Sequence, residues 1–238
     1  MEVNDSVGDD ITANRGSWSF YDIKHNNFQD HVLKSVPGYS KGHDYITCLS
    51  DYFVSSDSQV YDIGCSTGSL IAKLSKYHAN KKSVHFIGIE PCSGFEEEFL
   101  TNISSLNREN HSFEFLQASI EDVELKKADL FISYYTLQFI HPRVRQSIVN
   151  SIYESLNWGG GFFLFEKVRG VDARFHEMIN LAYLEYKKTV GYTDQEIISK
   201  MFSLKGVLEP FSSNENFNFL KRAGFKDITI ISKDLCFE

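Results

Sequence analysis

Short apolar segments alternate with amphipathic segments along most of the chain. The apolar runs are rich in Val, Ile and Phe, and the segments between them repeat their apolar positions every three to four residues. We therefore expect five strands, at residues 59–63, 83–90, 112–119, 128–135 and 161–168, and four helices, at 43–54, 69–77, 92–106 and 143–156. The last of these helices should stop at the glycine-rich stretch 157–161. Strand and helix alternating at this spacing predict an α/β fold with a parallel sheet covered on both faces.

The pattern changes after residue 168. A long amphipathic helix is expected over 172–190, followed by helices at 193–205 and 214–223 and by a sixth strand within 227–238. The segment 172–210 is longer than a plain crossover, so we interpret it as a helical insertion that serves as a lid or as a dimerisation element. Residues 1–17 are polar and acidic and are expected to form a flexible arm, which leaves 18–238 as the main domain.

Composition narrows the class of protein. A chain of 238 residues with 42% hydrophobic residues can build one large core, and its net charge of −8 argues against a broad nucleic-acid surface. The sequence contains no apolar run long enough to span a membrane and no secretory signal at its N-terminus. The four cysteines show neither CxxC pairing nor histidines at metal-ligand spacing, so we expect a reduced cytoplasmic protein without a metal site.

The segment VYDIGCSTGSL, residues 60–70, is the clearest functional signal. It joins the first strand of the sheet to a helix through a glycine loop, and Glu90 follows the second strand, where an acid can bind ribose hydroxyls. The three glycines of a dinucleotide fingerprint are absent, since Ser66 occupies the second small position. Asp62 could help to hold an amino-acid ammonium group. These features favour S-adenosylmethionine over NAD, and the alternative is a purely structural turn beside a surface acid.

Residues after the fourth and fifth strands are candidates for chemistry. Methyl transfer depends mainly on positioning, and Tyr134, Tyr135 and His141 are the catalytic candidates because they follow the fourth strand. For His141, a turn or capping role before Pro142 is the competing interpretation. Glu166 and Lys167 are expected to form an internal ion pair. The aromatic residues of the insertion could wall an apolar pocket for an uncharged acceptor; they are Tyr183, Tyr186, Tyr192 and Phe202.

Several stretches together resemble one family, the carboxy-S-adenosyl-L-methionine synthases, a branch of the class I methyltransferase fold. They are SVPGYS (35–40), VYDIGCSTG (60–68), TLQFIHP (136–142), IYESLNWGG (152–160), FEKV (165–168), GYTDQEIISK (191–200) and AGF (223–225). The resemblance implies a Rossmann-like, mostly parallel sheet of seven strands, the last of them truncated here, and a homodimer. It also implies synthesis of a carboxylated cofactor from S-adenosylmethionine and prephenate, used later in modifying a tRNA wobble uridine.

The resemblance assigns cofactor contacts position by position. They are Tyr39, Gly64, Cys65, Ser66, Glu90, Pro91, Ser119, Ile120, Tyr134 and Met201, to which the loop itself adds Asp62. Three positions depart from the family pattern: Ser119 replaces an Asp that reads adenine, Tyr134 replaces an Asn, and Met201 replaces the Arg that binds the transferred carboxylate. Lys200 precedes Met201 and should point about 100° away around the helix.

These departures leave three functions open. We expect an S-adenosylmethionine-dependent methyltransferase that acts on a small molecule, releases S-adenosylhomocysteine and binds neither nucleic acid nor membrane. The first alternative is carboxy-S-adenosylmethionine synthase itself, with a substitute cation near Met201. The second is a cofactor-binding module without catalytic activity.

Overall fold

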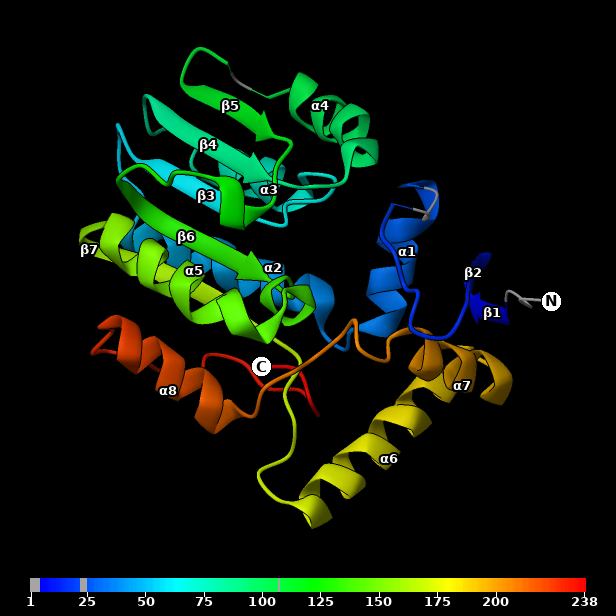
Figure 1. The fold of residues 1–238 in the computed structure, drawn as a ribbon. Helices are drawn as coiled ribbons and strands as arrows, with labels where there is room; N and C mark the ends of the chain where they lie inside the picture. Colours follow the sequence, from blue (N-terminus) through cyan, green and yellow to red (C-terminus); the bar gives the residue numbers. More distant parts are fainter. Residues whose placement is uncertain (1–4, 22–24, 107) are drawn as a thin grey trace.

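The computed structural model describes residues 5–21, 25–106 and 108–238 and contains a five-stranded parallel sheet (Figure 1). The strand order is β5-β4-β3-β6-β7, and every neighbouring pair is parallel. The strands are β3 (Gln59–Ile63), β4 (Val84–Ile89), β5 (His111–Leu116), β6 (Ala128–Tyr134) and β7 (Leu156–Phe165). The predicted α/β class is confirmed, and all five predicted strands of the alternating region are present.

Helices cover both faces of this sheet because residues along each strand alternate between two apolar clusters. Val60 on β3 packs in one cluster with α2 (Tyr39–Leu49), α3 (Ser69–Tyr77) and α4 (Glu96–Ser104). Its neighbour Tyr61 packs in the other with α5 (Pro142–Ser155) and α8 (Ser213–Ala223). Short 3-10 turns lie at Ser50–Tyr52, Ser93–Phe95, Ile120–Asp122 and Leu137–Phe139.

The sheet order reverses at β3, which lies between β4 and β6. Ligands of open α/β sheets bind beyond the carboxyl ends of the strands at such a switch point. In Figure 1 the strand arrows point toward α1 (His25–Ser35), α7 (Asp194–Ser203) and the N-terminal hairpin of residues 5–13, so these elements lie on the side of the sheet where such ligands bind.

The C-terminal half of the sheet differs from the expectation in two ways. The glycine-rich stretch 157–161 does not end a helix by itself: α5 ends at Ser155 and the stretch already belongs to β7, with a register irregularity opposite β6. The sixth strand predicted within 227–238 does not form. Instead the last residues pair antiparallel with the chain just after β7, through backbone hydrogen bonds between Glu166 and Glu238 and from Val168 to Cys236. The sheet of the described residues therefore has five strands rather than seven.

The N-terminal segment also differs from the expected flexible arm. Residues 5–13 form an antiparallel hairpin of β1 (Asp5–Gly8) and β2 (Ile11–Ala13), whose Val7 is buried. Both turn residues, Asp9 and Asp10, have positive φ, as a tight two-residue hairpin turn requires. Gly16 and Trp18 then donate backbone N–H groups to carbonyls of α7. The hairpin is followed by α1 (His25–Ser35). Residues 1–4 lie outside the described part.

The predicted insertion consists of α6 (Ala173–Thr189) and α7 (Asp194–Ser203). Asp172 caps α6 by accepting the Phe175 N–H, and Thr193 forms a capping box with Glu196 at the start of α7. The caps fix where both helices begin. In the described residues, none of the helices is both long and apolar enough to cross a bilayer.

Candidate functional site

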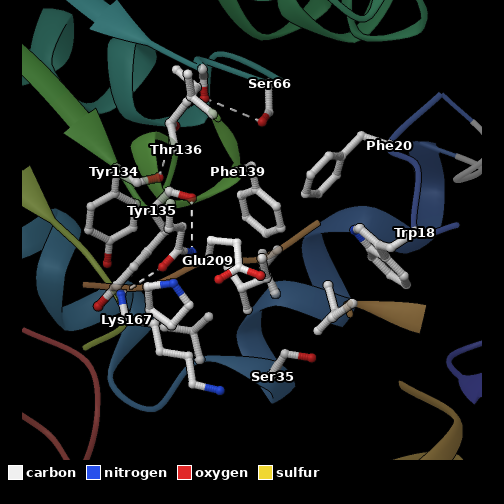
Figure 2. A pocket seen from close by; sticks show the side chains of 18 of the residues that line it. Trp18, Phe20, Ser35, Ser66, Tyr134, Tyr135, Thr136, Phe139, Lys167 and Glu209 are labelled. Atoms are coloured by element: carbon white, nitrogen blue, oxygen red, sulfur yellow. Dashed lines mark hydrogen bonds between the residues drawn. The ribbon is translucent and has the colours of Figure 1, made fainter. Parts of the chain in front are cut away.

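One cavity of about 940 Å³ lies at the carboxyl ends of the strands and extends to α1, α6 and α7. Its volume is near the upper end of the usual range for small-molecule sites, which reaches about 1,000 Å³. Figure 2 shows Ser66 and Thr136 from the sheet loops on one side of this cavity and Trp18 and Ser35 from the N-terminal elements on the other. All the predicted site residues line it: Tyr39, Asp62, Gly64, Cys65, Ser66, Glu90, Pro91, Ser119, Ile120, Tyr134, Tyr135, His141 and Met201.

The glycine loop between β3 and α3 has a backbone that requires glycine. Gly64 has φ +74° and Gly68 φ +70°, both in the left-handed region. A Cβ on Gly64 would collide with the side chain of Thr136, and one on Gly68 would collide with the ring of Phe99. The loop therefore owes its shape to two glycines that cannot be replaced without moving the side chain of Thr136 or of Phe99.

Two buried acids face this loop. Glu90 accepts the backbone N–H of Ser66 at 3.2 Å and that of Cys92 at 3.0 Å. Asp62 is 2% exposed, and its burial, with Glu90 nearby, raises the pKa of its carboxyl group to about 7. Burial also raises the pKa of Glu90. Such carboxylates fit a ligand that brings hydroxyl or ammonium donors.

The tyrosines at the end of β6 are held by packing. The Tyr134 hydroxyl donates to the backbone carbonyl of Tyr39, and Tyr135, with φ +60°, stacks against the Tyr39 ring at 6.3 Å between centroids. Burial raises the pKa of all three hydroxyls above the ordinary value. They are therefore neutral phenols at physiological pH and are unsuited to act as bases there.

His141 caps α5. Its Nδ1 accepts the backbone N–H of Arg143 at 3.2 Å, directly before Pro142 at the first helical position. The side chain borders the cavity, yet it is exposed and already engaged. This geometry fits the capping role of His141, which was the alternative to a catalytic role.

Three lysines form the opposite wall of the cavity: Lys167 after β7, Lys187 on α6 and Lys200 on α7. Lys187 and Lys200 are each only 5% exposed, and among the described residues none of the three forms an ion pair with a carboxylate. Burial lowers the pKa of all three ammonium groups, that of Lys187 to about 8. This wall is a set of desolvated amines that, within the described ranges, make no direct ion pair with a carboxylate.

Aromatic rings surround these lysines. The Lys167 Nζ lies 4.6 Å from the centre of the Tyr183 ring, and the Lys187 Nζ lies 5.3 Å from that of Tyr192. Of the predicted aromatic wall, only Tyr183 and Phe202 line the cavity, and the wall also carries amines, so the pocket is not the uncharged surface that we expected.

Two side-chain placements differ from the expectation. Lys200 is buried in the cavity wall, whereas Met201, which also borders the cavity, is 56% exposed, so the helix buries its lysine rather than its methionine. Glu166 and Lys167 form no ion pair in the described part of the chain, because successive residues of an extended segment point to opposite sides. Glu166 is instead buried, and the nearby backbone N–H groups of Leu137 and Gln138 only partly offset the rise in the pKa of its carboxyl group that burial causes.

The three lysines were not predicted as site residues, although the sequence contains a signal for two of them. Lys187 follows Tyr183 by four positions and Lys200 follows Ile197 by three, so each lies on the buried stripe of its helix. A lysine at a core position of an amphipathic helix is unusual enough to mark a ligand site.

The chain is similar to known proteins over most of its length. Residues 60–160 match the model of a methyltransferase domain. The carboxy-S-adenosyl-L-methionine synthase of Staphylococcus epidermidis is 34% identical over 203 residues, which cover 85% of this chain and 86% of the relative. That of Campylobacter lari is 33% identical over 211 residues, covering 89% and 88%.

Solved structures share the fold at low identity. The cyclopropane synthase MmaA2 of Mycobacterium tuberculosis superposes with a TM-score of 0.57 at 13% identity, over 82% of this chain and 64% of that one. Human N-acetylserotonin methyltransferase, solved with S-adenosylmethionine, gives 0.57 at 17% identity, over 90% and 53%. This chain thus spans less than two thirds of either solved chain. The fold is that of the Rossmann-like methyltransferases, and the chain belongs to the carboxy-S-adenosyl-L-methionine synthase family.

Proposed function

We propose that the chain binds S-adenosylmethionine at the glycine loop and transfers a carboxyl group to its sulfonium methyl, as carboxy-S-adenosyl-L-methionine synthase. The names of the relatives support the reaction, and the family's methyltransferase fold supports the cofactor. In this assignment Glu90 binds the ribose hydroxyls and Asp62 the methionine ammonium, beside Gly64, Cys65 and Ser66. Ser119 and Ile120 border the adenine.

The observation that carries the proposal is that one cavity joins an acidic end to a lysine end. An uncharged methyl acceptor would supply no counter-ion, and these desolvated amines would then favour their neutral forms. A dicarboxylate such as prephenate would pair with them. The lysines therefore favour an acidic co-substrate over the uncharged acceptor that the aromatic residues suggested.

The atoms of this reaction balance with prephenate as the donor. One C–H bond of the sulfonium methyl breaks, and a C–C bond to the incoming carboxyl carbon forms. Prephenate loses its ring carboxyl and ring hydroxyl groups and becomes phenylpyruvate. The hydroxyl leaves as water together with the methyl proton.

Mass spectrometry of the reacted cofactor tests the function. With S-adenosylmethionine and prephenate, we expect the cofactor to gain the mass of one CO₂ unit, and Lys187→Met to reduce this product strongly. Lys188→Met is the matched control, because that lysine is exposed and pairs with Asp194. Formation of S-adenosylhomocysteine with another small molecule would instead support methyl transfer. Failure to bind or convert the cofactor would overturn both.

The glycine loop gives a separate test of cofactor binding. Gly64→Ala should weaken S-adenosylhomocysteine binding by more than about tenfold, or 1.4 kcal/mol, because the new Cβ collides with Thr136. Gly159→Ala is the control: Gly159 also has positive φ, but nothing lies within 4 Å of its Cβ position. Unchanged binding to the Gly64 variant in calorimetry would refute the loop assignment.

We also infer a cytoplasmic homodimer that does not bind nucleic acid directly. The acidic net charge of −8 supports the absence of nucleic-acid binding. The exposed apolar side chains on α6 and α7 support the dimer and the assignment of 172–210 to its interface; they are Phe175, Met178, Leu181, Ile198, Met201 and Phe202.

A further inference from the structure

A chain of polar contacts links the N-terminal hairpin to the lysine wall. Asp9, in the β1–β2 turn, lies 2.7 Å from the His31 Nδ1, and the His31 Nε2 lies 2.9 Å from the Lys200 Nζ. All three side chains are at least nine-tenths buried. The chain thus connects three elements that are far apart in the sequence: the hairpin, α1 and α7.

The partners of His31 determine its tautomer. The Asp9 carboxylate is ionised, because hydrogen bonds from His31, Lys34 and Tyr192 hold its pKa well below the usual range despite burial. A carboxylate can only accept, so the His31 Nδ1 carries the proton and donates it. The Nε2 therefore accepts a hydrogen bond from Lys200, which aligns that side chain.

Trp18 supplies a second observation at the same wall. The Trp18 ring stacks on His31 with centroids 5.5 Å apart. The Lys200 Nζ lies over the Trp18 ring, 2.6 Å from its centre. The Trp18 Nε1–H is buried and has no hydrogen-bond partner in the described part of the protein. A buried donor without a partner beside a buried amine indicates a place for an acceptor that the ligand brings.

We propose that Lys200 holds a carboxylate of the co-substrate and that Asp9 and His31 are the positioning residues that aim it into the cavity. Lys200 thereby replaces the arginine that the family pattern places at Met201. This proposal deepens the proposed function and rests on it. It also makes the N-terminal hairpin part of the site, since Asp9 anchors the contact chain.

The charges around Lys200 give the expected pH dependence. His31 and Lys34 come from α1, Asp9 from the hairpin, Lys187 from α6, and Tyr192 from the turn before α7. Lys187 and burial lower the pKa of Lys200, whereas Asp9 raises it. Lys200 must carry a proton to bind a carboxylate. Loss of the Asp9 charge should therefore move the alkaline loss of co-substrate binding to lower pH.

Trp18 itself can report on this wall. The chain has two tryptophans, and Trp158 is fully exposed, so Trp158→Phe leaves Trp18 as the single reporter. In that background, malonate should change the fluorescence saturably, and Lys200→Met should remove the response. The control Lys188→Met should retain it. A response that persists without Lys200 would overturn the proposal, as would its absence from the parent protein.

Steady-state kinetics with prephenate then separate positioning from mere packing. His31→Phe preserves the stacked ring but loses both nitrogens, and should raise the KM for prephenate roughly tenfold or more; His31→Gln should restore most of it. Asp9→Asn should shift the pH profile of KM to lower pH, and Asp10→Asn, at an exposed neighbour, should not. An unchanged KM in His31→Phe, or an unshifted profile in Asp9→Asn, would overturn the positioning role.

The two proposals can fail separately. Suppose that no carboxylated cofactor forms but the Trp18 response depends on Lys200 and His31. The carboxylate-binding site at Lys200 is then supported and the proposed reaction is refuted. If the product forms and Lys200→Met leaves the KM for prephenate unchanged, the proposed reaction is supported and this assignment of Lys200 is wrong. Binding of S-adenosylhomocysteine should be normal in every variant.

Discussion

Asp62 links stability to ligand binding at the scale of a single residue. Its pKa is about 7 in the folded chain against an ordinary 3.8, so between these values the folded state binds more protons than the unfolded state. The free energy of unfolding should therefore fall as pH rises from about 4 to about 7. We expect Asp62→Asn to be more stable than the parent at pH 8, by an amount on the order of a few kcal/mol, in urea unfolding without ligand. An equal or lower stability would contradict this.

The same carboxyl group should make cofactor binding depend on pH. An ammonium group binds the ionised carboxylate, so the affinity for S-adenosylhomocysteine should rise between pH 5.5 and 7.5 in calorimetry, and Asp62→Asn should abolish that rise. Glu166→Gln is the control. Burial raises the pKa of Glu166 to about 8, and the variant should alter the pH dependence of stability without altering that of binding. A flat affinity in the parent protein would contradict the role of Asp62.

His141 offers a clear choice between capping and catalysis. His141→Ala removes the acceptor for the Arg143 N–H and should lower the free energy of unfolding by about 0.5–2 kcal/mol, with little change in kcat. His141→Asn should recover the stability, because Asn is a good N-cap. A large fall in kcat for both variants at unchanged stability would restore the catalytic interpretation.

At the scale of elements, local signals predicted some boundaries well and others poorly. The strand at 59–63 and the helix at 69–77 match β3 and α3, because apolar periodicity and the glycine loop mark both ends. The glycines at 159–161 marked a boundary correctly but lie in a strand, since their neighbours on β6 decide the pairing. The hairpin turn Asp9-Asp10 lacks the Asn-Gly or Asp-Gly signal, so the sequence did not predict β1 and β2.

The insertion helices α6 and α7 are the basis of our prediction about the oligomeric state. Phe175, Met178 and Leu181 lie three residues apart on α6 and are each more than half exposed, which is unusual for large apolar side chains at helical spacing. Leu181→Glu should convert a dimer into a monomer in light scattering. Leu100→Glu, at a comparably exposed leucine of α4, should leave the dimer intact. A parent protein that is monomeric, or a dimer unaffected by Leu181→Glu, would contradict this interface.

At the scale of the whole molecule, the site divides into a part that the sequence predicts and a part that it does not. Asp62 and Gly64 lie at the end of β3 and Glu90 follows the adjacent β4, so the sheet order alone brings them together. Asp9, His31 and Lys200 meet only because the hairpin, α1 and α7 pack on one another, and no local pattern encodes that contact. Lys200 and Met201 are an example, since only the packing decides which of these two neighbours is buried.

Hydrogen exchange should reveal these two parts as separate footprints. S-adenosylhomocysteine should slow exchange in the loop 64–68 and at 90–92, where the backbone N–H groups of Ser66 and Cys92 already bond Glu90. Prephenate, added to the complex with S-adenosylhomocysteine, should slow exchange in the hairpin, α1 and α7, because the contact chain from Asp9 to Lys200 tightens when a carboxylate neutralises the amine. His31→Phe should lose the second footprint and keep the first. Protection by prephenate confined to the sheet loops would show that the co-substrate binds without the N-terminal elements.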